Sequence, residues 1–261
     1  MGISNIIFII LLLGSVVWFS INVKKIISNI QLGRKVDRSD NPGLRWKTMI
    51  KVALGQSKMT AKPVAGLLHI VVYAGFVIIN LEMLEIIIDG ITGSHRVFEP
   101  ILGGLYRPFI NVFEMLALGV LIGCVIFFMR RNIVRIPRFH KAEMKTWPKS
   151  DANIILIVEI LLMTAFLFMN AADGFLISWT AKQDEYFVIS GWISGALPSK
   201  IAHIHYVERF CWWFHITGVF AFLNYLPYSK HFHILLAFPA TYYSNLSPKG
   251  QFSNMEAVTN E

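Results

Sequence analysis

Long apolar stretches alternate with short polar ones along this chain. A helix rises about 1.5 Å per residue, so about 20 consecutive, mostly apolar residues are needed to cross a hydrocarbon core of about 30 Å. Five stretches meet this requirement: residues 4–23, 65–88, 109–129, 152–172 and 206–226. The pattern therefore predicts an all-α integral membrane protein, a bundle of five transmembrane helices.

Composition and charge add an orientation to this picture. Hydrophobic residues make up 55% of the chain and charged residues only 15%, against roughly 25% charged residues in a soluble domain. The connections 24–62 and 130–149 hold ten and seven Lys and Arg residues, whereas 89–107 and 173–205 hold two each. By the positive-inside rule, the basic connections are cytoplasmic, so the N-terminus lies outside and the C-terminus is cytoplasmic. A face beside anionic lipid explains the net charge of +8 without a nucleic-acid partner.

The same pattern divides the chain into a membrane domain, residues 1–238, and a cytoplasmic tail, residues 239–261. The first apolar run has no basic segment before it and no small-residue cleavage site after it, so we interpret it as a retained span rather than a signal peptide. An amphipathic stretch from Trp46 to Met59 is expected to lie on the inner membrane surface.

Turn residues predict where the later segments bend. Residues 173–205 are mixed in polarity and are expected to form a small external loop. Pro227 lacks a backbone N–H and is expected to kink or end the fifth span. The tail residues Pro239, Tyr242-Tyr243 and Pro248 suggest an extended docking segment.

Two cysteines, Cys124 and Cys211, both lie within apolar spans. An iron–sulfur cluster takes about four thiolates, and a disulfide framework takes several paired ones. Any iron–sulfur cluster associated with this chain is therefore expected on another chain or domain.

Histidine is costly inside a membrane, so the eight histidines were compared by position. His95, His140, His203 and His205 lie in or beside connections and are interpreted as solvated or interfacial. The remaining four are the candidates for chemistry: His69, His215, His231 and His233.

His69 and His233 come from different predicted helices but share a depth near the inner surface. Two imidazoles at one level on neighbouring helices are what bis-histidine haem ligation requires. His215 lies eighteen residues before His233, so on a helix that stays regular past Pro227 the two point the same way, about 27 Å apart. His231 then faces elsewhere. Small residues beside these histidines leave room for a macrocycle or serve ordinary helix packing: Gly66, Gly75 and Gly218.

Acidic residues inside the spans are further candidates, either as proton relays or as parts of a quinone pocket. They are Glu82, Glu85, Glu114, Glu159 and the pair Glu208-Arg209. The structural alternative is that those near the external end pair with one another or meet interfacial water.

The segment from His215 to His233 has a histidine, an apolar run, the turn Pro227-Tyr-Ser-Lys230 and a second histidine eighteen residues after the first. It resembles the last span of the gamma (cytochrome b) subunit of respiratory nitrate reductase. That resemblance implies five spans, an external N-terminus and a haem b near the cytoplasmic side, ligated by His69 and His233. The family has a second span-two histidine where this chain has Ile79. One haem is therefore favoured, and two are possible with His215 as a further ligand.

Several strings resemble the membrane regions of bacterial iron–sulfur oxidoreductases related to heterodisulfide reductase, and this second resemblance is the closer one. They are Trp46-Lys-Thr-Met, Ala53-Leu-Gly-Gln-Ser-Lys-Met, Lys62-Pro-Val-Ala-Gly-Leu-Leu-His69 and Ala237-Phe-Pro-Ala-Thr-Tyr-Tyr-Ser-Asn-Leu. The resemblance implies a multi-pass protein of the bacterial inner (cytoplasmic) membrane. It also implies a separate soluble iron–sulfur subunit on the cytoplasmic face.

Together these features predict a membrane cytochrome b electron-transfer subunit. It would pass electrons between the quinone pool and a cytoplasmic iron–sulfur oxidoreductase partner, as part of a multi-subunit oxidoreductase rather than as a catalyst alone. No catalytic residue is assigned. The alternative is a redox-inactive membrane anchor or a small transporter without haem, although the chain has no inverted repeat of the kind common in transporters.

Overall fold

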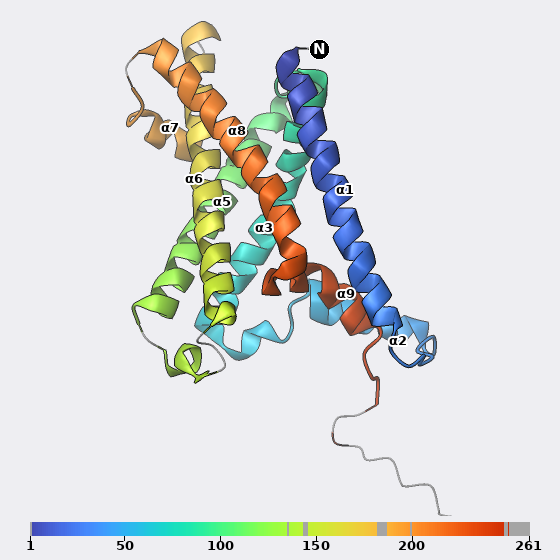
Figure 1. The fold of residues 1–261 in the computed structure, drawn as a ribbon. Helices are drawn as coiled ribbons and strands as arrows, with labels where there is room; N and C mark the ends of the chain where they lie inside the picture. Colours follow the sequence, from blue (N-terminus) through green and yellow to red (C-terminus); the bar gives the residue numbers. More distant parts are fainter. Residues whose placement is uncertain are drawn as a thin grey trace, which may run out of the picture. The chain divides into compact units, whose positions relative to one another are not determined.

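The structure is a computed structural model, and it describes residues 2–134, 136–142, 146–181, 187–198, 200–247 and 250. Every regular element in these ranges is a helix, which confirms the predicted all-α class (Figure 1). The long helices are α1 (Ile3–Gln31), α3 (Pro63–Thr92), α5 (Tyr106–Asn132), α6 (Trp147–Ala181) and α8 (Ile201–Tyr225). The shorter ones are α2 (Pro42–Met49), α4 (Glu99–Leu102), α7 (Val188–Ser194) and α9 (His233–Tyr242).

Four helical segments are long and apolar enough to cross a membrane, which supports a multi-pass membrane protein. They are Ile3–Gln31, Pro63–Thr92, Glu99–Asn132 and Trp147–Thr180, at the positions of the first four predicted spans. Helix α8 lies at the fifth position and has 25 residues, so it is about 37 Å long. It carries Glu208, Arg209 and His215 and is not among these four segments. Crossing by α8 and the orientation of the termini therefore stay predictions.

The chain divides into two compact units. Unit 1 comprises Met1–Gly33 and Met59–Phe232 and holds all five long helices. Unit 2 comprises Arg34–Lys58 and the residues from His233 onward, with α2 and α9.

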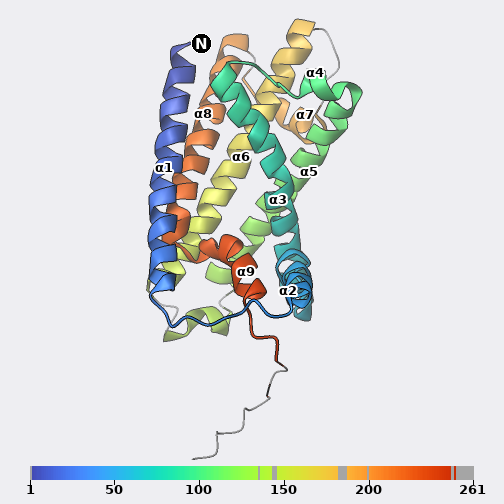
Figure 2. The same ribbon diagram turned by 90° about the vertical axis from the view of Figure 1, so that its right-hand side faces the viewer.

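In unit 1 the five long helices form a closed ring. Helix α1 contacts α3 and α8, helix α3 also contacts α5, and helix α6 contacts both α5 and α8. Figures 1 and 2 show these helices running side by side along one direction. The centre of the ring is packed with fully buried side chains such as Ala117, Phe166 and Ile216. Burying such side chains holds the helices together within the ring.

Two glycines permit close helix approach in this ring. A Cβ on Gly75 would meet Val120 Cγ2 at 2.3 Å, and a Cβ on Gly218 would meet Leu162 Cδ2 at 2.6 Å. Both positions are therefore filled by side chains of the neighbouring helix. Of the two sequence-based interpretations, the structure favours helix packing over room for a macrocycle at Gly75 and Gly218.

The helix does not stay regular past Pro227, so the condition under which His215 and His233 would share one helix face is not met. Helix α8 ends at Tyr225, two short 3₁₀ turns follow at Leu226–Tyr228 and Lys230–Phe232, and α9 begins at His233. Pro227 lies in the first of these turns and has no N–H to continue the helix. The prediction that Pro227 ends the fifth helix is confirmed.

The connection predicted at residues 173–205 is also shorter than expected. Helix α6 continues to Ala181, so the first part of the predicted loop 173–205 is helical. Helix α7 forms within the loop, and α8 starts at Ile201. The region of residues 182–186 lies outside the described part of the chain.

In unit 2, the start of the tail is helical rather than extended. Pro239 lies inside α9, which continues to Tyr242. The buried Arg45 side chain donates from Nη1 to the carbonyl oxygens of Tyr242 and Ser244, both at 3.0 Å. A guanidinium at these carbonyls satisfies acceptors that the helix leaves open at its C-terminus. Pro248 and residues 251–261 of the predicted docking segment lie outside the described residues.

The amphipathic segment that we predicted from Trp46 to Met59 is helical only in its first part. Helix α2 passes into a π-helical turn at Ile50–Leu54, which ends at Gly55. The ring of Trp46 packs edge-on against Tyr242, with 5.4 Å between the ring centroids.

Candidate functional site

A group of acidic side chains lies at one end of the unit 1 bundle. Glu82, Glu85 and Asp89 follow one another on α3 at spacings of three and four, which places them on one face of the helix. The helix ends at Gly93, whose φ of +80° suits the left-handed C-cap. Asn5 of α1 donates to the carbonyl oxygen of Gly90 at 2.8 Å. This end of α3 therefore lies beside the start of α1.

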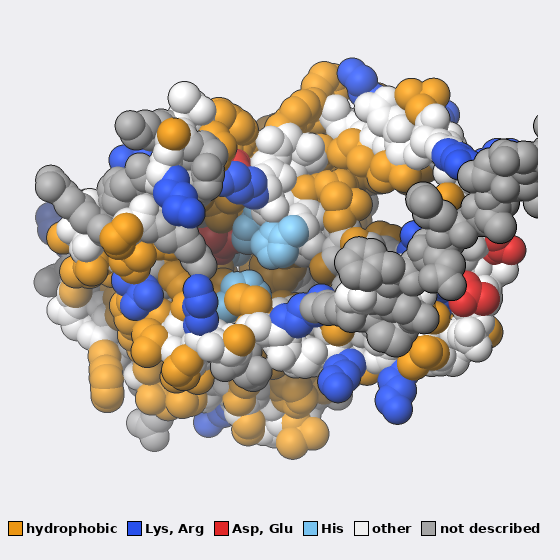
Figure 3. Space-filling model, turned by 90° about the horizontal axis from the view of Figure 1, so that it is seen from below, with side chains coloured by type: hydrophobic (Ala, Val, Ile, Leu, Met, Phe, Trp, Pro, Cys, Tyr) orange, Lys and Arg blue, Asp and Glu red, His pale blue; other side chains and the backbone are white. Residues whose placement is uncertain are grey.

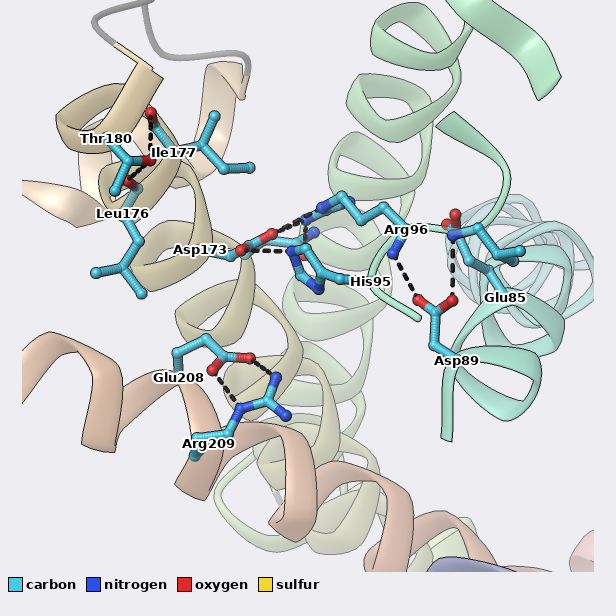
Figure 4. Close-up of polar contacts among 12 residues, drawn as sticks. Glu85, Asp89, His95, Arg96, Asp173, Leu176, Ile177, Thr180, Glu208 and Arg209 are labelled. Carbon is cyan, nitrogen blue, oxygen red and sulfur yellow. Dashed lines mark hydrogen bonds and ion pairs between the residues drawn. The ribbon is translucent and has the colours of Figure 1, made fainter. Parts of the chain in front are cut away.

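The loop after α3 folds back onto these carboxylates. The backbone N–H groups of Arg96 and Val97 donate to Asp89 at 2.7 and 3.1 Å. The N–H of Phe98 donates to Glu85 Oε1 at 2.8 Å. Arg96 has a φ of +53°, an uncommon value for a residue with a side chain. These bonds hold the loop in a shape that turns the Arg96 side chain inward (Figure 4).

Arg96 is buried and connects three helices. Its Nε and Nη2 lie 2.7 and 2.6 Å from Asp173 Oδ2 on α6, and its Nη1 donates to the Tyr106 hydroxyl of α5 at 2.9 Å. Its guanidinium lies 4.8 Å from the ring centroid of Phe187. Burial alone would lower the pKa of Arg96, but Asp173 and Tyr106 raise it above its usual range. The arginine therefore stays charged within the bundle.

His95 connects this network to the surface. Its Nε2 lies 3.0 Å from Asp173 Oδ1, while 58% of its side chain remains exposed. The hydrogen bond to Asp173 raises the pKa of His95. The interpretation of His95 as a solvated or interfacial histidine agrees with its exposure, but it did not include the bond to Asp173. His203 and His205 are exposed as predicted, and the side chain of His140 lies outside the described residues.

A cavity of about 340 Å³ lies against this network, between α3, α4 and α5. Its lining residues are Leu81, Glu82, Glu85, Phe98, Ile101, Leu102, Tyr106, Phe109, Ile110 and Phe113. The volume is within the range of small-molecule sites, about 300–1,000 Å³. Three of the ten lining residues, Glu82, Glu85 and Tyr106, carry polar side-chain atoms.

These three polar groups differ in how many of their hydrogen-bonding atoms already have a partner. Glu85 accepts from the Phe98 N–H and, at 2.9 Å, from the Tyr106 hydroxyl. That bond occupies the only proton that Tyr106 can donate. Glu82 is 3% exposed, and its Oε2 has no hydrogen-bond partner among the described residues. Glu82 is therefore the lining group with unused hydrogen-bonding capacity.

Other predicted acidic candidates are structural. Glu114 is fully buried. It accepts from the backbone N–H groups of Ile189 and Ser190, both at 3.2 Å, and from the Ser190 hydroxyl. Glu114 thus holds α7 against α5. Glu208 pairs with Arg209, its neighbour on α8 (Figure 4).

His215 is buried, and its Nδ1 lies 3.0 Å from the carbonyl oxygen of Leu162. A carbonyl oxygen only accepts, so Nδ1 carries the proton and Nε2 keeps its lone pair. This tautomer suits an axial ligand in its donor chemistry. However, the space beside His215 at Gly218 is filled by Leu162. The surroundings therefore do not fit a macrocycle at His215.

The structure does not place His69 and His233 relative to each other, because they belong to different units. His69 lies on α3, and His233 is the first residue of α9. His231 belongs to unit 1, where its ring lies 6.4 Å from that of Phe76 on α3 and 5.4 Å from that of Phe222 on α8. No group of three or more His, Cys, Asp and Glu side chains suited to a metal ion occurs in the described part of the chain. Cys124 and Cys211 are both free and buried.

The residues that form hydrogen bonds with the candidate carboxylates and with the loop after α3 were not predicted from the sequence. Asp89, Arg96, Tyr106 and Ser190 were not singled out. The spacing of Glu82, Glu85 and Asp89 was the available signal, because acidic residues on one face of an apolar helix need partners. Arg96, one of two basic residues in its connection, was the candidate partner.

The fold and the site define a multi-pass helical membrane protein with an apolar pocket beside a buried acidic network. Two curated relatives were found. The probable iron-sulfur-binding oxidoreductase FadF of Bacillus subtilis is 24% identical over 261 residues, which is 97% of this chain and 34% of that protein. The EtfAB:quinone oxidoreductase of Syntrophomonas wolfei is 24% identical over 223 residues, which is 82% of this chain and 30% of that protein.

This chain thus spans about a third of the length of these relatives. Both relatives are named as oxidoreductases, and the first as iron-sulfur-binding, which supports a relation to oxidoreductases. Neither name mentions a cytochrome b or a nitrate reductase subunit. No protein-family model matches the chain, and no solved structure is significantly similar to it.

Proposed function

We propose that this chain is the membrane electron-transfer part of an oxidoreductase that exchanges electrons with the quinone pool. The observation that carries the proposal is the similarity along 97% of the chain to a relative named as an iron-sulfur-binding oxidoreductase. The second relative is named as a quinone oxidoreductase. Four helices able to cross a membrane, and an apolar pocket among them, support a membrane-soluble redox partner.

The electron carrier that we propose in the membrane is one b-type haem, with His69 and His233 as its axial ligands. A haem held by two imidazoles supplies reversible one-electron transfer, and the protein supplies the ligands and the apolar surroundings. The packing of Leu162 at Gly218, one turn from His215, argues against a second haem at His215.

We further propose that electrons pass to or from an iron–sulfur partner on the cytoplasmic face. The chain's two cysteines are too few to hold a cluster, so the cluster belongs to a partner or to a further domain. The basic connections support the cytoplasmic orientation of that face. Figure 3 shows many Lys and Arg side chains, and few Asp and Glu, on the face seen from below. Such a face also favours docking of an acidic partner.

The test is an absorption spectrum of the detergent-purified chain, taken before and after reduction with dithionite. We expect the spectrum of a bis-histidine b-type haem, and one haem per chain in a pyridine haemochrome assay. His69→Ala and His233→Ala should each abolish the haem absorbance while the protein still inserts and purifies, because each removes one axial ligand.

The matched control is His231→Ala, which removes a neighbouring imidazole that packs against Phe76 and Phe222. It should retain the haem. Full haem in His69→Ala or His233→Ala contradicts the ligand assignment, and loss of haem in His231→Ala alone moves the ligand to that residue. A wild-type chain that never carries haem favours the redox-inactive anchor or transporter.

A further inference from the structure

We infer that the cavity between α3, α4 and α5 is the binding site for the ring of a quinol, with Glu82 as its hydrogen-bond partner. The inference rests on the proposed quinone-linked function, and it adds a location and a residue that neither the similarity to relatives nor the histidine positions supply.

The cavity is apolar on its exposed side and has polar groups on its buried side, which suits an amphiphilic ligand that enters from the membrane. Ile101 and Leu81, on its outer side, are 72% and 52% exposed, and both side chains are apolar. Ile110 and Phe113, on its inner side, are buried. The lining residues with polar side chains, Glu82, Glu85 and Tyr106, are also buried. A matching ligand therefore has an apolar part that contacts the exposed side of the cavity and a polar atom that reaches its buried side. A substituted quinol ring with an isoprenoid tail has this shape.

Glu82 supplies the polar contact. Its buried Oε2 has no partner among the described residues, although a buried polar atom is ordinarily hydrogen-bonded. Its neighbours in the lining, Glu85 and Tyr106, are already bonded to each other. A carboxylate accepts from a quinol hydroxyl, and a protonated carboxyl group donates to a quinone carbonyl. Glu82 therefore offers a partner to both redox forms of the ligand.

The network around the cavity keeps its shape. Arg96 contacts Tyr106 and Asp173, and Glu85 holds the loop at Phe98. A preorganised wall lowers the entropic cost of binding. Glu82 differs from Glu85 and Tyr106 because its Oε2 has no hydrogen-bond partner among the described residues.

This difference yields a test that separates binding from stability. Glu82→Leu removes an unpartnered buried oxygen, so the unfolding midpoint in detergent should stay the same or rise. The dissociation constant for 2-heptyl-4-hydroxyquinoline N-oxide, a quinol analogue whose fluorescence is quenched on binding, should rise about 10- to 100-fold with the loss of one charge-assisted hydrogen bond. A purely structural Glu82 predicts the reverse, namely a lower midpoint and unchanged binding.

A second variant tests the cavity independently of charge. Leu102→Trp places a larger side chain in the lining and should weaken binding of the analogue by about tenfold or more. The matched control is Leu84→Trp, which enlarges an exposed leucine of α3 outside the lining. It should bind the analogue as the wild type does.

Three outcomes would overturn the inference. If the wild type binds the analogue and both lining variants bind it equally well, this cavity is not the site, while the quinone-linked function still stands. If phosphatidylglycerol displaces the analogue as well as an added quinol does, the cavity holds lipid acyl chains. If the wild type does not bind the analogue at all, the quinone part of the proposed function fails together with this inference.

Discussion

The two ends of the unit 1 bundle are stabilised in different ways. At the end beside the start of α1, a buried arginine, several carboxylates and a tyrosine form one network that joins α3, α5 and α6. At the opposite end, the buried carboxylate of Asp151 accepts from the Tyr225 hydroxyl at 2.7 Å and from the Lys230 N–H at 3.0 Å. Asn132 and Asn153 add a neutral pair of amide hydrogen bonds between α5 and α6.

The larger number of buried charges at the first end suggests that the side chains there must keep a fixed arrangement. Burying an ion pair costs desolvation energy that apolar packing would avoid, so such a pair is weak evidence for stability alone. At the first end the network surrounds a cavity that apolar side chains would otherwise fill. At the second end the buried carboxylate of Asp151 is held by neutral donors, the Tyr225 hydroxyl and the Lys230 N–H. Three predictions test this comparison.

The largest effect is expected at the first end. Arg96→Met keeps the length of the side chain and the positive φ of the position but removes the charge opposite Asp173. Leaving a buried carboxylate without its main partner should cost about 3–5 kcal/mol of unfolding free energy. The measurement is the unfolding midpoint of the purified protein in detergent.

The double variant Arg96→Met with Asp173→Leu is the control for this prediction. It removes both charges and should recover part of the lost stability, because no uncompensated carboxylate remains. An Arg96→Met protein as stable as the wild type would mean that the network does not hold this end of the bundle.

A smaller effect is expected at the opposite end. Asp151→Asn keeps an oxygen for the Tyr225 hydroxyl but sets an amide donor against the N–H of Lys230. One buried donor then loses its acceptor, which should cost about 1–3 kcal/mol. The same unfolding assay measures it, with Asp37→Asn as the control because that carboxylate is exposed. A loss as large as that of Arg96→Met would remove the contrast between the two ends.

The smallest effect concerns pH. The folded protein raises the pKa of His95 above its ordinary value of about 6.5, through the hydrogen bond to Asp173. Protonated His95 therefore contributes stability that is complete below about pH 6.5 and is lost as the pH rises through the folded-state pKa. Because the imidazole is more than half exposed, solvent screening should limit the contribution to about 1 kcal/mol or less.

The measurement compares the wild type with His95→Gln by their unfolding midpoints at pH 5.5 and pH 9. The wild type should be the more stable at pH 5.5, and the difference should shrink at pH 9. A difference that is independent of pH would show that His95 acts through packing rather than through its charge. Arg96 keeps its charge over this range.

The helices themselves were largely predictable from local pattern. Four of the predicted spans coincide with helices able to cross a membrane, and Pro227 marks the end of α8 as expected. Segments whose polarity is mixed were predicted less well. Residues 173–181 continue α6, and Pro239 lies within α9, because tertiary contacts override weak local preferences.

The candidate site was predictable only in part. Glu82 and Glu85 were recognised because a carboxyl group within an apolar helix is costly and therefore informative. Glu85 has hydrogen-bond partners because Phe98 and Tyr106 fold back onto it, and these residues lie 13 and 21 positions further along the chain. No such partner reaches Oε2 of Glu82 among the described residues. The pairing of Arg96 with Asp173 spans 77 residues and has no sequence periodicity to indicate it.

By itself, the sequence determined the apolar character of this protein and the approximate positions of its main helices, because hydrophobicity and helical rise act locally along the chain. It also determined which residues are chemically able to bind iron or exchange protons. Only the tertiary structure decided which buried carboxyl group is left with a free oxygen, and that an apolar cavity opens beside it. Those features depend on how side chains from α3, α4, α5 and α6 meet in space, and hydrogen bonding and close packing act between residues that are distant in sequence.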